Sequence, residues 1–182
     1  LKNSDELNGM REAGKLAAEV LEMITDYVKP GISTGELDEI CFKYITDVQK
    51  AIPANVGYRG FKKTLCTSIN QVICHGIPDT NRILKSGDIM NIDVTVIKDG
   101  WHGDTSKMFL IGKAQSHNER LVRVTQECLY KGIEAARPGA RLGDIGNAIQ
   151  IHAEKNYYSV VEEYCGHGIG KIYHDEPQIL HY

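Results

Sequence analysis

The sequence lacks the features that would place it in several large protein classes. None of its apolar runs approaches the length of about 20 residues that a transmembrane helix needs. Lys and Arg number 21 against 24 Asp and Glu, so the basic surplus typical of nucleic-acid-binding proteins is absent. The polar N-terminus, Leu1–Met10, has no signal-peptide core. We therefore expect a soluble cytoplasmic protein that binds neither nucleic acid nor membranes.

Cysteine is scarce and has no regular spacing. The chain has five cysteines, an odd number, and no Cys-x-x-Cys pair, which argues against a disulfide framework and against a structural zinc ribbon. Its 42% hydrophobic and 25% charged residues are close to the globular average. A length of 182 residues is enough for one well-buried domain.

Hydrophobic periodicity predicts a mixture of helices and strands. Apolar residues at helical spacing predict helices over residues 4–28, 34–48, 117–136 and 142–156. Segments rich in β-formers predict strands over residues 64–69, 72–74, 89–97, 101–111 and 159–163. Lys98-Asp99-Gly100 is a hairpin turn signal between the two long strands. Three histidines in polar segments are expected at the surface: His102, His117 and His152.

A nine-residue segment occurs twice. Lys29–Leu37 resembles Arg137–Ile145, which lies 108 residues further along, and each copy joins two amphipathic helices. This repeat predicts a duplicated helix–helix–strand unit within a single domain of residues 1–182, with halves of about 1–112 and 113–182. On this offset the end of the chain corresponds to Cys74, so we expect the second half to lack its C-terminal strands.

A polar stripe runs along one face of the predicted hairpin. Asn91, Asp93 and Thr95 alternate with apolar residues, although Asp is disfavoured in strands. The turn predicts a register in which Asp93 faces Ser106 and Thr95 faces Asp104, with the Cα atoms of the two aspartates about 7–8 Å apart at most. Converging carboxylates repel each other unless a cation lies between them, either a divalent metal ion or an Arg or Lys of another segment. A solvated, exposed pair is the third possibility.

Histidines near glycines could complete such a site. His75 precedes Gly76, His167 lies between two glycines, and His174 follows seven residues later. Beside a pair of carboxylates, these histidines favour a metal site with mixed oxygen and nitrogen ligands. The spacing Gly166-x-Gly168-x-Gly170 differs from the dinucleotide-binding fingerprint, so a Rossmann fold is not expected.

Four segments carry a family resemblance: Asn70–Pro78, Gly87–Val94, Gly100–Ser106 and Tyr164–Gly170. Together they strongly resemble the type I methionine aminopeptidases of bacteria. The resemblance implies an α+β pita-bread fold, in which two related αβ halves surround an antiparallel sheet with a dinuclear metal centre. It also implies a hydrolase that removes the initiator methionine from nascent polypeptides through a metal-activated water.

The resemblance assigns roles to individual residues. The matching metal ligands are Asp93, Asp104 and His167. The catalytic histidines, which contact the substrate and the developing oxyanion, are His75 and His174. The methionine pocket is lined by Tyr58, Phe61, Cys66 and Tyr173. Thr95 supports the metal ligands, and the backbone carbonyls of Asn70 and Val72 match part of a structural site for Na⁺ or K⁺.

The implied cofactors are two divalent ions, drawn from Co, Mn, Fe and Zn. The implied partners are the N-termini of nascent chains near the ribosome, and the implied state is a monomer.

Two departures from the family pattern stand out. Arg59 occupies a position where many relatives have histidine, and two further glutamate ligands of the family come from a stretch beyond Tyr182. We therefore expect the 182-residue chain by itself to bind metal weakly and to hydrolyse poorly.

Two other functions are compatible with the same fold. One is a proline-directed peptidase. The other is a non-catalytic module that binds peptides or ribosomes, which the presence of Asp93, Asp104 and His167 argues against.

Overall fold

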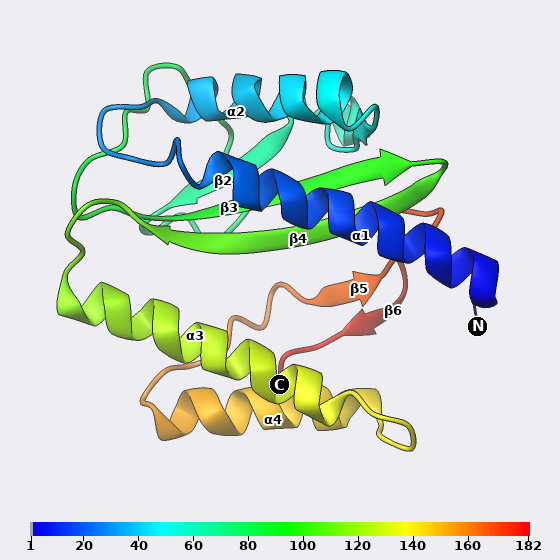
Figure 1. Ribbon diagram of the computed structural model, residues 1–182. Helices are drawn as coiled ribbons and strands as arrows, with labels where there is room; N and C mark the ends of the chain where they lie inside the picture. The colour runs from blue at the N-terminus through cyan, green and yellow to red at the C-terminus, as the bar shows by residue number, and fades with distance from the viewer. Residues whose placement is uncertain (1) are drawn as a thin grey trace. The chain divides into compact units, whose positions relative to one another are not determined.

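The computed structural model describes residues 2–182 (Figure 1). The chain forms two compact units. Unit 1 runs to Gln115 and also includes Gly170–Tyr173, whereas unit 2 consists of Ser116–Ile169 and His174–Tyr182. Each unit is described by itself.

Two helices of unit 1 begin at capping boxes. Helix α1, Ser4–Ile24, starts where the Asn3 side chain accepts from the Glu6 amide while the Glu6 carboxylate accepts from the Asn3 amide. Helix α2, Thr34–Lys43, starts in the same way at Ser33 and Glu36. It continues into a π-helical turn, η1, Tyr44–Val48. Both predicted helices are confirmed, although α1 ends a few residues early.

Unit 1 has a four-stranded antiparallel sheet. Its strands are β1, Ile52–Pro53; β2, Leu65–Ile69; β3, Ile89–Lys98; and β4, Trp101–Leu110. Strand β3 pairs with β4 along its full length, so β2 and then β1 share its other edge. Asp99 and Gly100, both with positive φ, form the tight turn of the hairpin. The predicted hairpin and its register are confirmed.

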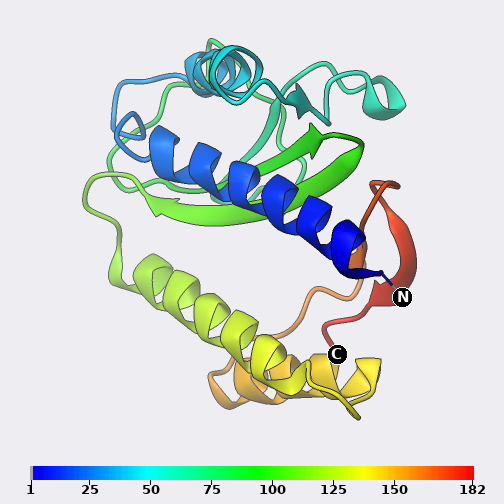
Figure 2. The ribbon, with the colours of Figure 1, turned by 45° about the vertical axis from the view of Figure 1, so that its right-hand side comes forward.

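The core of unit 1 lies between one face of the sheet and the helices. Every second residue of β3 is fully buried against this core, namely Met90, Ile92, Val94 and Val96. Helix α1 runs along β3 and β4 (Figure 2). It approaches β4 so closely that a side chain at Gly103 would overlap the backbone of Ala13. Polar residues occupy the opposite face of β3, and the candidate site lies on that face.

Unit 2 contains a helix pair and a two-stranded sheet. Helices α3, Ser116–Ala135, and α4, Leu142–Lys155, pack side by side. Strands β5, Gly166–Gly168, and β6, Asp175–Ile179, pair antiparallel. Helix α4 starts 108 residues after α2, and the Asp144 carboxylate accepts from the Arg141 amide as Glu36 does from Ser33. The repeated segment therefore starts a helix in the same way twice.

Two predicted strands are wrong. Residues 72–74 lie in a turn and loop after β2, where Val72 and Ile73 are exposed and no strand pairs with them. Residues 159–163 are irregular, because Val160 packs against the helix core of unit 2 instead of joining a sheet. In both places the β-forming residues are present but a neighbouring strand is not.

No helix within residues 2–182 is both long enough and apolar enough to cross a membrane.

Candidate active site

The polar face of the β3–β4 hairpin brings two aspartates together. Asp93 lies opposite Ser106, and Asp104 lies opposite Thr95, so both carboxyl groups project from the same face of the sheet. The two carboxyl groups share a hydrogen bond. Burial, as the largest cause, together with the charge of Asp104 and this hydrogen bond raises the pKa of Asp93 to about 7. A carboxyl pair that holds a proton in this way is poised to exchange it for a cation.

The donor chemistry of this pair fits a divalent metal ion. Carboxylate oxygens are suitable ligands for hard and borderline divalent cations, and a bound cation would remove the repulsion that raises the pKa of Asp93. An Arg or Lys side chain was the other cation predicted to lie between the carboxylates, but no residue of either type contributes to the pKa shift of Asp93. Asp93 is half-buried whereas Asp104 is exposed, so the predicted solvated environment is found at Asp104 only.

Cys66 and Thr95 lie next to the aspartates. Cys66 on β2 is the cross-strand partner of Asp93, and burial raises the pKa of its thiol to about 12. The thiol therefore stays neutral and acts as a small apolar group. The fully buried Thr95 donates from its hydroxyl to Asp104 Oδ1 at 3.0 Å. This bond supplies the support that the resemblance implies for Thr95.

Two tyrosines from distant parts of the sequence meet near Thr95. The ring of Tyr173 lies 4.8 Å from that of Tyr58, between centroids, and its hydroxyl lies 2.6 Å from Thr95 Oγ1. The Arg59 guanidinium lies over the Tyr58 ring at 5.4 Å. Phe61 follows the 3₁₀ turn η2, Tyr58–Gly60, and its amide donates to the Tyr58 carbonyl at 2.9 Å. Tyr58 and Tyr173 thus form one aromatic cluster, with Arg59 on its outside.

His75, Asn70 and Val72 belong to the loop that follows β2. The amide of Val72 donates to the Ile69 carbonyl at 3.1 Å, and both Asn70 and His75 have positive φ. The loop is tied to β2 where the Thr67 amide donates to the Gly76 carbonyl at 2.7 Å. A side chain at Gly76 would overlap the Thr67 backbone, so glycine is required for this close approach.

The other two candidate histidines lie together in unit 2. The ring centroids of His167 on β5 and His174 just before β6 are 4.3 Å apart, with 37° between the ring planes. His167 Nδ1 lies 2.9 Å from the Gly168 carbonyl oxygen. Among residues 2–182, no three His, Cys, Asp or Glu side chains converge as a complete metal site.

Sequence reasoning missed two residues of this region. His102, expected at the surface, is half-buried: its ring stacks on Tyr173 at 5.4 Å and its Nδ1 lies 2.9 Å from the Gly170 carbonyl oxygen. Asn55 is buried and accepts from the Tyr173 hydroxyl at 2.8 Å. The only available signal for Asn55 was an amide side chain in an apolar stretch.

His152, also expected at the surface, is half-buried and lies 2.8 Å from Glu127, whereas His117 is exposed as predicted.

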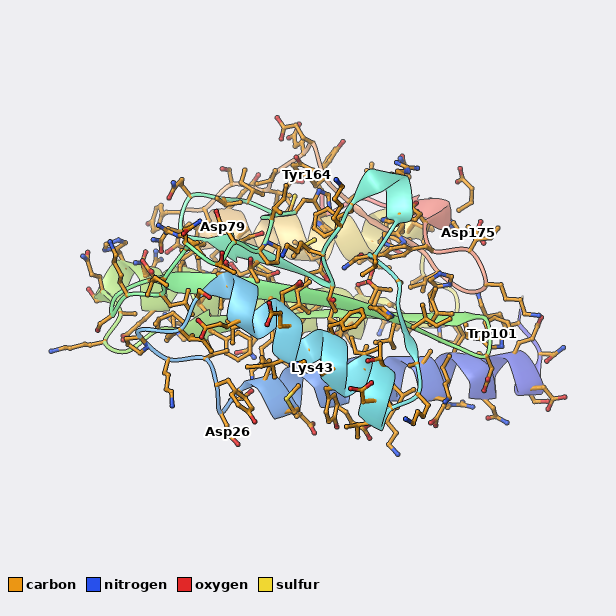
Figure 3. All side chains as sticks on the ribbon, turned by 90° about the horizontal axis from the view of Figure 1, so that it is seen from above. Asp26, Lys43, Asp79, Trp101, Tyr164 and Asp175 are labelled. Carbon is orange, nitrogen blue, oxygen red and sulfur yellow. The ribbon has the colours of Figure 1, made fainter. Side chains whose placement is uncertain are left out.

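A shallow cavity of about 200 Å³ opens elsewhere in unit 1, beside α2. Lys43, labelled in Figure 3, is one of the residues that line it. Asp38 lines it and accepts from the Thr64 and Leu65 amides. None of the candidate site residues lines this cavity, so it plays no part in the site described above.

Comparison with known proteins decides the family. The model of metallopeptidase family M24 matches residues 8–182. Methionine aminopeptidase from Salmonella typhimurium is 62% identical over 182 residues, which are 100% of this chain and 69% of that protein. The same enzyme from Escherichia coli K12 is 59% identical with the same coverage. The chain belongs to the methionine aminopeptidases of family M24. As a metallopeptidase, it uses a metal ion as its cofactor.

Solved structures agree with this assignment. Methionine aminopeptidase from Rickettsia prowazekii superposes with a TM-score of 0.97 at 55% identity, covering 100% of this chain and 73% of that one. Prolidase from Pyrococcus furiosus gives a TM-score of 0.85 at 17% identity, which shows a shared fold only. The expected α+β pita-bread fold is confirmed, and the methionine-specific resemblance is much the stronger one.

Proposed function

We propose that this protein removes the N-terminal methionine from peptides in a metal-dependent hydrolysis. The observation that carries the proposal is the Asp93–Asp104 pair on one face of the hairpin, in a chain 59–62% identical to methionine aminopeptidases. The proline-directed enzymes among the similar structures are 15–18% identical to this chain, which shows a shared fold and not a shared substrate. The non-catalytic alternative is disfavoured because the acidic pair is retained.

In this proposal Asp93, Asp104 and His167 hold the metal ions. Two divalent ions would polarise the scissile carbonyl of the peptide and lower the pKa of a water molecule. Thr95 orients the Asp104 carboxylate through its 3.0 Å hydrogen bond. The metal is one that tolerates mixed oxygen and nitrogen ligands, such as Co, Mn, Fe or Zn.

The remaining candidates act on the peptide. His75 and His174 donate hydrogen bonds that strengthen as negative charge develops on the scissile carbonyl oxygen. Tyr58, Phe61, Cys66 and Tyr173 surround the methionine side chain, for which aromatic rings and a neutral thiol offer a polarisable apolar surface. The carbonyls of Asn70 and Val72 bind a structural Na⁺ or K⁺ ion. We place units 1 and 2 in one catalytic domain, because both contain the repeated helix start.

We place the protein in the cytoplasm as a monomer that acts on nascent chains near the ribosome. All five cysteines are unpaired thiols, which fits a reducing compartment.

The test is peptide hydrolysis by the full-length protein after metal removal. Met-Ala-Ser and Leu-Ala-Ser peptides, and an X-Pro peptide, are incubated with and without Mn²⁺ or Co²⁺. We expect free methionine from the first peptide only, and only with metal. Cleavage of X-Pro in preference would favour the proline-directed alternative, and metal-independent release of methionine would contradict the proposal. Asp93→Ala should abolish both bound metal and activity.

A further inference from the structure

A line of hydrogen-bonded polar groups runs through unit 1 from Asn55, which follows β1, to the candidate metal ligand Asp104. Asn55 Nδ2 donates to the Thr64 carbonyl at 2.9 Å, and Asn55 Oδ1 accepts from the Tyr173 hydroxyl at 2.8 Å. That hydroxyl lies 2.6 Å from Thr95 Oγ1, and Thr95 donates to Asp104 Oδ1 at 3.0 Å. The line joins residues separated by 118 positions in the sequence.

Lining an apolar pocket does not require the hydroxyl of Tyr173. The ring alone makes the contacts with Tyr58 at 4.8 Å and with His102 at 5.4 Å. Burial raises the pKa of the hydroxyl well above its usual value, so it remains a neutral donor. A buried hydroxyl is costly unless it is hydrogen-bonded. Asn55 and Thr95, 7% and 0% exposed, are the polar groups that accommodate it.

The position of Thr95 explains what the hydroxyl can do. Thr95 has a single hydroxyl proton, and the structure directs it to Asp104. The Tyr173 hydroxyl also has a single proton, and it lies within reach of two acceptors, Thr95 Oγ1 at 2.6 Å and Asn55 Oδ1 at 2.8 Å, which share it. Partners of this kind orient a ligating carboxylate and usually change metal affinity when they are removed.

We propose that Tyr173 is a positioning residue that holds the Asp104 carboxylate for metal binding through Thr95, while its ring bounds the methionine pocket, with Asn55 as its anchor. The inference rests on the proposed metal-dependent function. In this proposal Asn55 holds the Tyr173 hydroxyl in place. Tyr173 then contacts the methionine side chain with its ring and supports the metal ligand Asp104 with its hydroxyl.

The decisive variant is Tyr173→Phe in the full-length protein, since it removes only the hydroxyl. Titration of the metal-free protein with Mn²⁺ by calorimetry should give a Kd roughly three- to tenfold higher than that of the wild type. At saturating Mn²⁺ the KM for a Met-Ala-Ser peptide should be unchanged, because the ring remains. Tyr44→Phe, another partly buried tyrosine of unit 1, is the matched control and should leave the Kd unaltered.

A double-mutant cycle tests whether Tyr173 acts through Thr95. In a Thr95→Val background, Tyr173→Phe should change the Mn²⁺ Kd by less than twofold. Thr95→Ser, which keeps the hydroxyl, should retain the wild-type Kd and covers the case in which Thr95→Val does not fold. A Kd for Tyr173→Phe within twofold of the wild type, or an equal loss in both backgrounds, would overturn the inference. If the wild type binds Mn²⁺ but releases no methionine, only the proposed function fails, because the Kd measurements need no peptide.

Discussion

Asp93 and Asp104 lie on adjacent strands but are not cross-strand partners: each faces a hydroxyl residue, and the two carboxyl groups meet diagonally on the polar face of the hairpin. This arrangement places two acidic groups close enough to share a hydrogen bond while Thr95 still donates to Asp104. Without a cation, such a pair destabilises the fold when both groups are ionised.

Asp93→Asn should therefore separate stability from metal binding. At pH 8 the metal-free variant should unfold at a higher urea concentration than the wild type, because the buried charge is gone, while its Mn²⁺ affinity falls by at least about tenfold. Urea unfolding followed by the fluorescence of Trp101, the single tryptophan, and calorimetry measure the two effects. The control is Asp99→Asn, the same change in the turn of the same hairpin, which should leave the affinity for Mn²⁺ unchanged. A variant with wild-type Mn²⁺ affinity would remove Asp93 from the site.

His167 and His174 should differ in what they do, although their rings are 4.3 Å apart. In the full-length protein His167→Ala should lower the bound metal, since a ligand is lost. His174→Ala should keep the metal but lower kcat by roughly 10²–10³, the cost of one lost donor to a developing oxyanion. Elemental analysis by mass spectrometry and a Met-Ala-Ser assay distinguish the two effects, with the exposed His117→Ala as control. Equal metal loss in both variants would contradict the division of roles.

The hairpin and its polar face were predictable because they depend on local signals. The Asp99-Gly100 turn sets the register, and the period of two then places Asp93 and Asp104 on one face. The contact of Tyr173 with Asn55 was not predictable, because it joins segments 118 residues apart and depends on how residues 170–173 reach unit 1. His102 was misjudged for the same reason: its polar sequence neighbours say nothing of the distant Tyr173 ring.

The two wrong strands have a related cause. Val72 and Ile73 have high β-propensity, but a strand needs a partner, and the chain here turns back so that Gly76 meets Thr67. The β-propensity of a segment can be read from a single sequence, but whether another strand lies beside that segment cannot.

Asp38 predicts a pH dependence that is independent of metal. Burial raises the pKa of its carboxyl above the usual value, although the Thr64 and Leu65 amides act in the opposite direction. The folded state therefore holds this proton more tightly than the unfolded state, so the stability from Asp38 is complete below its unfolded pKa and is lost as the pH rises through the folded pKa. Asp38→Asn keeps an oxygen for both amides and should reduce this loss. Urea unfolding at several pH values between 4 and 7 measures it, and Glu22→Gln, an exposed position of α1 that does not contribute to the pKa shift of Asp38, should behave like the wild type.

Gly103 and Gly14 should respond in opposite ways to the same substitution. A Cβ at Gly103 would overlap the Ala13 carbonyl, a backbone group that can move only if α1 shifts away from β4. Gly103→Ala should therefore lower the free energy of unfolding by about 1–3 kcal/mol and, through Asp104 on the same strand, weaken Mn²⁺ binding. Gly14 is exposed within α1 and a Cβ there meets no atom within 4 Å, so Gly14→Ala should raise the free energy of unfolding by roughly 0.5–1 kcal/mol through helix propensity. Urea unfolding of both variants tests the packing of α1 on β4, and a Gly103→Ala protein as stable as the wild type would contradict it.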